Sequence, residues 1–189
     1  MPQTGSAQLA DPSRRAEIEL VAAVQQNPSA FRTLYEQYAR PVYRYLYVIV
    51  GNPADAEDLT SQVFLKALED LGQFRNQGGF RAWLFAIARS RAMDSFRQRR
   101  RELPLDGIEL PSPDPDPLAA VIHQQDVECM RKRISALPEA EQELLWLRFV
   151  AGLSFAEMGA VLKRREGSVK KALYRLLDRL GEQVEAGHA

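Results

Sequence analysis

The sequence has one cysteine, two histidines and no long apolar run, and each shortage excludes a class of protein. A single thiol, Cys129, cannot form an internal disulfide, which argues against a secreted disulfide scaffold. One cysteine and two distant histidines, His123 and His188, do not assemble a zinc site. No stretch approaches the roughly 18 apolar residues that cross a bilayer, and the N-terminus lacks the basic-then-apolar order of a signal peptide. We therefore expect a cytoplasmic protein without metal, cofactor or membrane insertion.

Sequence motifs of catalysis are also missing. We find no P-loop, no glycine-rich dinucleotide fingerprint, and no Ser/His/Asp or Cys/His arrangement for nucleophilic catalysis. The composition is otherwise ordinary, because 46% of the 189 residues are hydrophobic and 26% are charged. We therefore expect a globular protein of one or two domains that is not an enzyme.

The net charge of zero conceals an ordered charge pattern. Residues 31–101 carry 12 basic and 7 acidic groups, and residues 163–180 carry 7 and 2, so each block has a charge of +5. Between them, residues 102–129 carry seven acidic groups and no lysine or arginine. Clustered Lys and Arg favour contact with a polyanion, although such blocks are also typical of solvated helix faces.

Apolar spacing predicts helices throughout and no convincing strand. The stripe in residues 29–50 has helical period, and Pro41 inside it should kink or divide that helix. Asn52 and Pro53 predict the cap and first turn of a second helix, on which Phe64 and Leu68 belong to the apolar face.

Two further segments divide the chain. Residues 72–79 predict a loop, and another apolar helical repeat starts at Phe80. Residues 102–120 are rich in proline and acid and predict an extended linker. The fold class expected is all-α, with a disordered tail over residues 1–17 and two helical domains, 18–101 and 121–184, joined by the acidic linker.

The second domain contains the sharpest local pattern, a predicted helix-turn-helix. Ser154 and Glu157 have capping-box spacing and open a helix in which Gly159 suggests close approach of another helix. A basic turn follows, and then an amphipathic helix to Leu180 with basic residues on its outward face. Such a helix can enter a major groove, although many helical hairpins bind no DNA.

In this order, the motifs resemble the extracytoplasmic function (ECF, group IV) class of bacterial RNA polymerase sigma factors. The resemblance covers about residues 28–182. In the first domain it rests on residues 55–59, 63–67, 74–75 and 80–89. In the second it rests on residues 137–139, 153–158 and 166–170. It implies that residues 18–101 are sigma region 2 and that residues 121–184 are sigma region 4.

The resemblance also implies roles for individual residues. For polymerase binding, these are Asp55, Asp58, Gln62 and Phe64. For the minus-ten element, they are Phe74, Arg75, Asn76, Arg81, Arg89, Arg91 and Arg97. For the minus-thirty-five element, they are Lys163, Arg164, Arg165, Ser168, Lys170, Lys171, Tyr174 and Arg175. Without the resemblance, the preferred interpretation is that Asp55 and Asp58 belong to a solvated first turn and that Phe64 is an ordinary core residue.

Two positions depart from the family pattern. Ser61 and Gln62 stand where the family usually has Gln-Glu, which removes one acidic group from the polymerase helix. Lys163 and Arg165 stand where the turn usually has glycine and a Ser or Pro cap, which weakens the cap and adds positive charge.

The resemblance implies a subunit that binds core RNA polymerase, directs it to specific promoters and helps to open the DNA. The partners expected are core polymerase, double- and single-stranded promoter DNA, and an anti-sigma factor. The alternative is a helix-turn-helix regulator that binds DNA but not polymerase.

Overall fold

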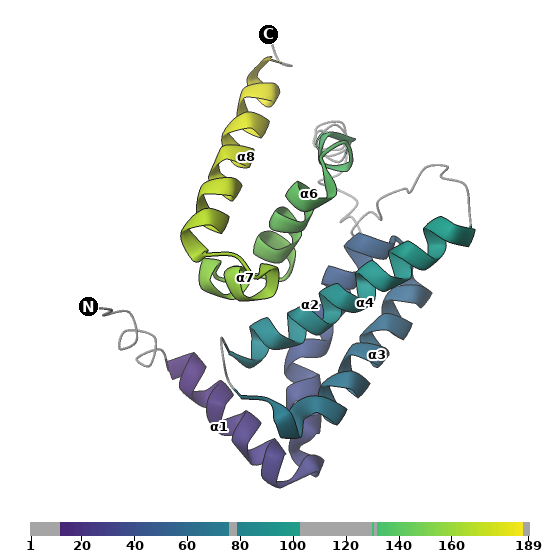
Figure 1. Ribbon diagram of the computed structural model, residues 1–189, viewed down its shortest axis with the longest axis vertical. Coiled ribbons are helices and arrows are strands. Elements are labelled where there is room, and N and C mark those ends of the chain that lie inside the picture. Colours follow the sequence, from purple (N-terminus) through teal and green to yellow (C-terminus); the bar gives the residue numbers. More distant parts are fainter. Residues whose placement is uncertain (1–11, 76–78, 103–129, 131, 187–189) are drawn as a thin grey trace, which may run out of the picture.

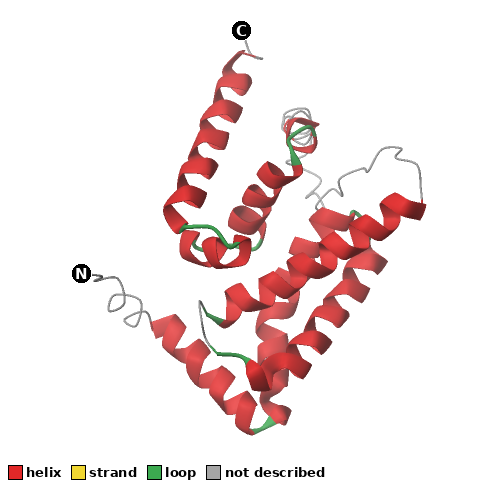
Figure 2. Ribbon diagram, in the orientation of Figure 1, coloured by secondary structure: helices red, strands yellow, loops and turns green. Residues whose placement is uncertain are grey.

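Figure 1 shows the computed structural model, which describes residues 12–75, 79–102, 130 and 132–186. Within these residues every regular element is a helix and none is a strand (Figure 2). The helices form two groups, one before and one after the segment 103–129, which confirms the prediction of two helical domains. The predicted linker lies outside the described residues, except for its first residue.

The first domain contains four long helices, α1 (Pro12–Gln26), α2 (Phe31–Val50), α3 (Pro53–Asp70) and α4 (Phe80–Glu102). Helices α2, α3 and α4 pack against one another. Their facing sides supply the fully buried side chains, among them Leu34, Val42, Leu46, Val63, Ala67, Leu84, Phe85 and Ala88. Burial of this stripe agrees with the helical period of the sequence.

The junction between α2 and α3 folds as its local sequence predicts. Gly51 adopts a left-handed conformation, with φ of 71°, and its N–H donates to the carbonyl of Tyr47. The Asn52 side chain then accepts hydrogen bonds from the N–H groups of Ala54, at 2.9 Å, and Asp55, at 3.3 Å. Free N–H groups at a helix start need such acceptors, so Asn52 caps α3 and Pro53 occupies its first turn.

Two expectations about the first domain differ from the structure. Helix α2 is continuous through Pro41, so a division there is wrong. Buried residues on both sides of the proline, Tyr38 and Val42, hold the two halves against the same core. The helix α1 begins at Pro12, inside the segment expected to be a tail, because Glu17 makes contacts with distant residues that local sequence does not reveal.

The second domain is a smaller helical unit. It contains α6 (Glu139–Leu145), a π-helical turn η4 (Trp146–Val150), α7 (Phe155–Leu162) and α8 (Glu166–Ala186). Helix α8 packs against α6 and α7. Their core includes Leu144, Leu147, Leu153, Met158, Val161, Val169, Leu173 and Leu176.

The two domains are in contact. Helix α4 of the first domain packs against α7, and α2 packs against η4 (Figure 1). The contact covers part of the α4 surface that the sequence assigns to DNA.

Candidate nucleic-acid interface

The helix pair α7–α8 is held by a capping box and a tight basic turn. The Ser154 side chain accepts the N–H of Glu157 at 3.2 Å, and the Glu157 carboxylate accepts the N–H of Ser154 at 2.7 Å. This confirms the predicted start of α7. A side chain at Gly159 would bring its Cβ within 2.8 Å of the Arg164 carbonyl oxygen, so the close neighbour is the turn backbone and the start of α8.

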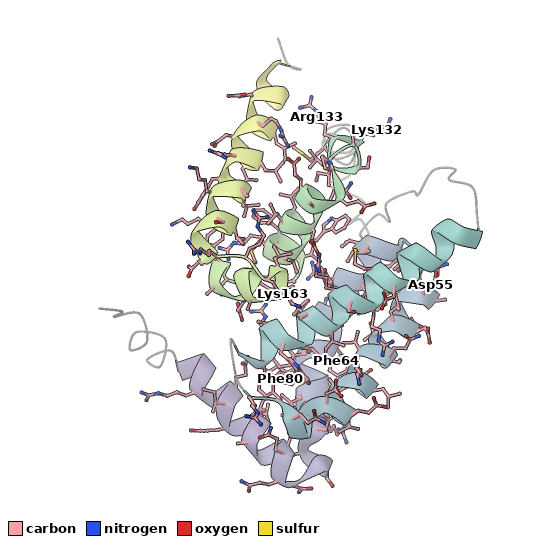
Figure 3. All side chains as sticks on the ribbon, viewed as in Figure 1. Asp55, Phe64, Phe80, Lys132, Arg133 and Lys163 are labelled. Atoms are coloured by element: carbon pink, nitrogen blue, oxygen red, sulfur yellow. The ribbon has the colours of Figure 1, made fainter. Side chains whose placement is uncertain are left out.

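Lys163 ends α7 in the left-handed conformation, with φ of 53°. It is the one residue other than glycine with positive φ among the residues that the structure describes. Glycine adopts this conformation without strain, whereas a side chain raises its energy. The departure from the family's glycine therefore places a strained lysine in the turn, next to Arg164 and Arg165 (Figure 3).

Helix α8 separates its apolar and basic faces as predicted. Val169, Leu173 and Leu176 are buried, while Lys170 and Arg175 are exposed. The remaining predicted contacts of this domain are exposed as well, namely Lys163, Arg164, Arg165, Ser168, Lys171 and Tyr174. Among the described residues, none of the lysines and arginines in this set forms an ion pair with a carboxylate. This cationic face is therefore available to an anion.

An aromatic residue missed in the sequence supports the outer face of α8. The Phe155 ring, on α7, lies 6.0 Å from the Tyr174 ring. The Lys170 ammonium lies 6.0 Å from the centre of each ring, and the Arg148 guanidinium lies 4.9 Å from that of Phe155. Cations over aromatic faces are attracted to them, so Phe155 helps to orient Lys170. Its position directly after the Ser154 cap could have indicated this role.

In the first domain, the predicted polymerase residues divide between surface and core. Asp58 is exposed and Gln62 half-buried, and the Gln62 amide donates to the Asp58 carboxylate at 2.7 Å. Asp55 lies half-buried in the first turn of α3. The Phe64 side chain is only 4% exposed and packs edge-on against Tyr35, with ring centroids 4.8 Å apart. In this structure Phe64 therefore lies in the core, as the alternative interpretation of its spacing had it.

The exposed apolar residues of α3 were missed or misplaced in the sequence. Leu65 is 60% exposed and lies on the same helix face as Asp58 and Gln62. Leu68 is 42% exposed, so its assignment to the inward face is wrong. Heptad spacing from Asp58 was the signal that could have identified Leu65.

The predicted minus-ten residues occupy several environments. Phe74 is half-buried, with its ring 4.9 Å from Trp83 and 5.9 Å from Phe80. Arg75 is exposed and Arg91 is half-buried on α4. Asn76 and the side chain of Arg97 lie outside the described residues.

Two of the predicted minus-ten arginines contact the second domain instead of solvent. Arg81 donates to the carbonyl of Ala151, and Arg89 forms a two-point ion pair with Glu143, with Nη2 to Oε2 at 3.1 Å. Hydrogen bonding to Glu143 raises the pKa of the Arg89 guanidinium. The Glu143 side chain is 11% exposed and that of Arg89 is 37% exposed. The two arginines therefore connect the domains in this arrangement.

Tyr45 lies fully buried in α2 beside this ion pair, and burial raises its pKa above the ordinary value. Its hydroxyl has no hydrogen-bond partner among the described residues. A buried hydroxyl without a hydrogen-bond partner lowers the free energy of unfolding, so the Tyr45 hydroxyl destabilises the packing beside this ion pair.

The described residues contain no cluster of His, Cys, Asp and Glu able to hold a metal ion. In the same part of the chain, no helix combines the length and apolar character needed to cross a membrane.

Comparison with known proteins adds family information to this geometry. Residues 34–102 match the sigma-70 region 2 family, and residues 127–180 match the sigma-70 region 4 family. The chain is 39% identical over 175 residues to the ECF RNA polymerase sigma factor BldN of Streptomyces coelicolor, covering 88% of this chain and 65% of BldN. It therefore spans just under two thirds of the length of that relative.

A second relative is matched over most of both chains. The ECF RNA polymerase sigma factor SigD of Mycobacterium tuberculosis is 30% identical over 180 residues, covering 91% of this chain and 85% of SigD. Among solved structures, that of CnrH in complex with the cytosolic domain of CnrY superposes with a TM-score of 0.67 at 22% identity. That match covers 90% of this chain and 98% of the other, and it shows that the fold is shared.

Proposed function

The chain belongs to the ECF RNA polymerase sigma factor family, and we propose that it binds core RNA polymerase, directs it to specific promoters and helps to open the DNA. Sigma factors are not enzymes, and the proposal assigns the chain no catalytic step of its own. We further place it in group IV of the class and in the cytoplasm, where core polymerase acts.

The cationic face of α8 is the observation that carries the proposal for DNA. A helix in the major groove needs an exposed outer face with donors for base edges, and basic neighbours for phosphates. We assign Arg175 and Lys171 to bases, and the turn residues Lys163, Arg164 and Arg165 to phosphates. Ser168, Lys170 and Tyr174 complete this surface toward the minus-thirty-five element.

Two single variants test this division. Arg175→Ala should remove roughly 1–3 kcal/mol of discrimination at one base position and relax preference there. Arg164→Ala should weaken binding to promoter and scrambled duplexes equally and reduce the salt slope by about 1. Salt-titrated binding to both duplexes measures the two effects. Equal weakening by Arg175→Ala, or a selective loss of promoter preference in Arg164→Ala, contradicts the assignment.

For polymerase binding we propose the outer face of α3. Asp55, Asp58 and Gln62 supply polar groups there, and Leu65 adds an exposed apolar side chain one turn beyond Gln62. Interfaces bury such apolar residues within a polar rim. Phe64 supports this face from the core, where it packs on Tyr35, and does not itself meet the partner.

For the minus-ten element we propose the surface around Phe74 and Arg75, continued by Asn76 and by the α4 arginines Arg81, Arg89, Arg91 and Arg97. An aromatic ring beside an exposed arginine suits an unstacked base and the adjoining phosphate. Because Arg81 and Arg89 bind the second domain here, they can reach DNA only after the domains separate.

One experiment distinguishes the proposed function from the alternative, a helix-turn-helix regulator that does not bind polymerase. Co-elution with purified core polymerase supports the sigma function, and the variant Asp58→Ala/Leu65→Ala should weaken it while leaving helix content unchanged. An anti-sigma factor is a further expected partner, since a solved structure of the same fold, with a TM-score of 0.64, is that of the sigma factor RpoE in complex with the anti-sigma factor NepR from Bartonella quintana.

A further inference from the structure

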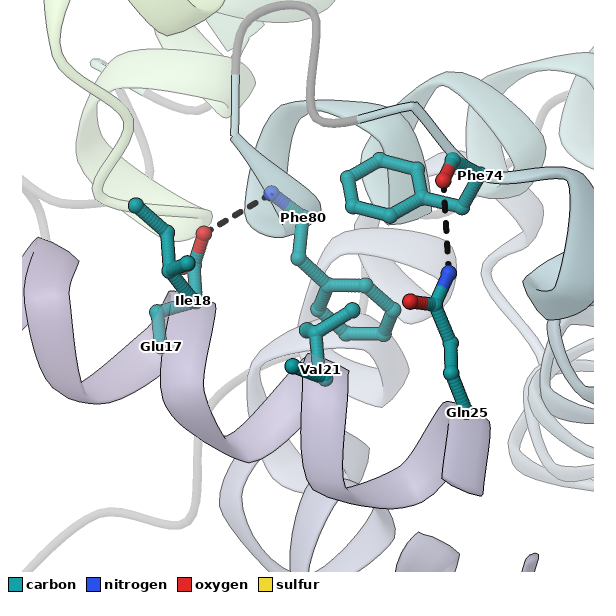
Figure 4. A pocket seen from close by; sticks show the side chains of 7 residues that line it. Glu17, Ile18, Val21, Gln25, Phe74 and Phe80 are labelled. Carbon is teal, nitrogen blue, oxygen red and sulfur yellow. Dashed lines mark hydrogen bonds between the residues drawn. The ribbon is translucent and has the colours of Figure 1, made fainter.

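The N-terminal helix α1 forms hydrogen bonds with both ends of the segment that joins α3 to α4. It precedes the residues that match sigma-70 region 2, so the family match gives it no role. Figure 4 shows three of its side chains, Glu17, Val21 and Gln25, pointing toward this segment. They are spaced four residues apart and therefore lie on one face of the helix.

At one end of the segment, the Gln25 amide binds the end of η3 (Leu71–Gln73). Its Nε2 donates to the Leu71 carbonyl at 2.8 Å and to the Phe74 carbonyl at 3.3 Å. The Leu71 carbonyl also accepts the Phe74 N–H at 3.1 Å, so the Gln25 amide adds a second donor there and joins Leu71 to the Phe74 carbonyl. A donor from another helix stabilises the position of the chain where it leaves a helix end. Gln25 thereby fixes the backbone of Phe74.

At the other end, the Glu17 carboxylate caps α4. Its Oε1 accepts the Phe80 N–H at 2.8 Å, and its Oε2 accepts the Tyr38 hydroxyl at 2.8 Å. A negative charge beside the first N–H groups of a helix is stabilising, since those groups carry partial positive charge. Glu17 thus fixes the start of α4 and is itself held by α2.

Between the two hydrogen-bonding sites lies a cavity of about 100 Å³, lined by apolar groups of α1 and by two aromatic rings. Val21 is 5% exposed and Phe80 is 1% exposed, so both of these side chains beside the cavity are buried. The Phe80 ring lies 5.9 Å from that of Phe74, so the two rings connect the end of η3 with the start of α4.

We propose that Glu17 and Gln25 are positioning residues for single-stranded DNA, which set the placement of Phe74 and the start of α4 while touching no DNA themselves. This inference rests on the proposed function, because that function assigns Phe74 and Arg75 to the minus-ten strand. It adds α1 to the parts of the chain that determine promoter opening.

The test uses the full chain in holoenzyme, with a labelled single strand that carries the minus-ten region of a promoter selected by the wild-type holoenzyme. The variants are Glu17→Gln, which removes the charge, and Gln25→Leu, which removes the donor. The matched controls are Glu19→Gln and Gln26→Leu, since both residues are exposed on α1 and neither makes a hydrogen bond recorded among the described residues.

Glu17→Gln and Gln25→Leu should each bind the single strand roughly three- to tenfold more weakly, which is the loss expected for one or two hydrogen bonds. The double variant should lose more, while co-elution with core polymerase and binding to minus-thirty-five duplex stay within about twofold of wild type. Val63→Ala serves as a stability control, because Val63 is fully buried on α3, whereas the long helices on which α1 mainly packs are α2 and α4. It should leave single-strand affinity unchanged at temperatures where the chain is folded.

Unchanged single-strand affinity in the double variant overturns the inference. So does an equal loss of duplex and polymerase binding, since that would mean α1 only stabilises the fold. Phe74→Ala and Arg75→Ala separate this failure from that of the proposed function. If they bind the single strand normally, the minus-ten assignment fails and the inference fails with it; if they weaken it and the α1 variants do not, only the inference fails.

Discussion

Replacing Glu143 with alanine should separate the two domains of the free chain. Glu143 and Arg89 form a two-point ion pair across the domain contact. Within the described residues, a hydrogen bond from Arg81 to the Ala151 carbonyl accompanies it between α4 and the second domain. Loss of the carboxylate leaves the Arg89 guanidinium facing a contact without a counterion.

The exposure of the two side chains sets the free-energy cost of losing this ion pair. Exposed ion pairs contribute about 0.2–1 kcal/mol, whereas breaking a fully buried pair costs about 3–5 kcal/mol. Arg89 is 37% exposed and can regain water, while Glu143 is 11% exposed. An intermediate cost of about 2 kcal/mol follows, which lowers the ratio of closed to open molecules roughly 30-fold.

The distance between the domains measures this change. Spin labels at two exposed positions, Ser61 on α3 and Glu182 on α8, report it after the single native cysteine is replaced by serine. The matched control is Glu141→Ala, because Glu141 pairs with Arg179 inside the second domain. Glu143→Ala should broaden and lengthen the distance distribution, and Glu141→Ala should not. Distributions that are identical for wild type and both variants refute the reasoning.

Four further substitutions have defined outcomes. Phe64→Ala should lower the free energy of unfolding by about 3–5 kcal/mol, as measured by urea unfolding. Leu65→Ala should change it by less than about 0.5 kcal/mol and should instead weaken core polymerase binding, as measured by co-elution. Burial raises the pKa of Tyr45, so its contribution to stability is complete below pH of about 10 and is lost as the pH rises further. Tyr45→Phe should therefore flatten the decline in stability above about pH 10 and remove the cost of its unpartnered hydroxyl, and an unchanged slope in urea unfolding would count against this. Lys163→Gly should raise the free energy of unfolding by up to about 1 kcal/mol, since it relieves a positive φ, while weakening all duplexes alike; a lower melting temperature would contradict it.

Local signals were predictable from the sequence because the interacting residues are close in the chain. The Asn52 cap of α3 and the Ser154–Glu157 capping box each join residues no more than three positions apart. The outward basic face of α8 followed from helical spacing in the same way. The departure from the family's glycine at Lys163 predicted a weaker cap, but it did not predict the left-handed backbone of this residue or the strain that follows from it.

Contacts between distant residues were not predictable. Arg81 meets Ala151 across 70 residues, and Arg89 meets Glu143 across 54 residues. Nothing in the local pattern of α4 separates an arginine that faces DNA from one that faces a neighbouring domain. The same holds for Glu17, whose partner Phe80 is 63 residues away. Along α3, helical spacing already placed Phe64 on the apolar face and left Leu65 off it, and the packing of Phe64 on Tyr35 agrees with that spacing.

Run-off transcription with purified bacterial core polymerase on a genomic fragment library tests the central claim most directly. If the chain is a promoter-specific sigma factor, discrete transcripts of defined length should appear only when it is added, and Arg175→Ala should change which fragments are transcribed. If no transcript depends on the chain, although the chain still binds duplex DNA, the account is contradicted and the protein is a DNA-binding regulator that acts without polymerase.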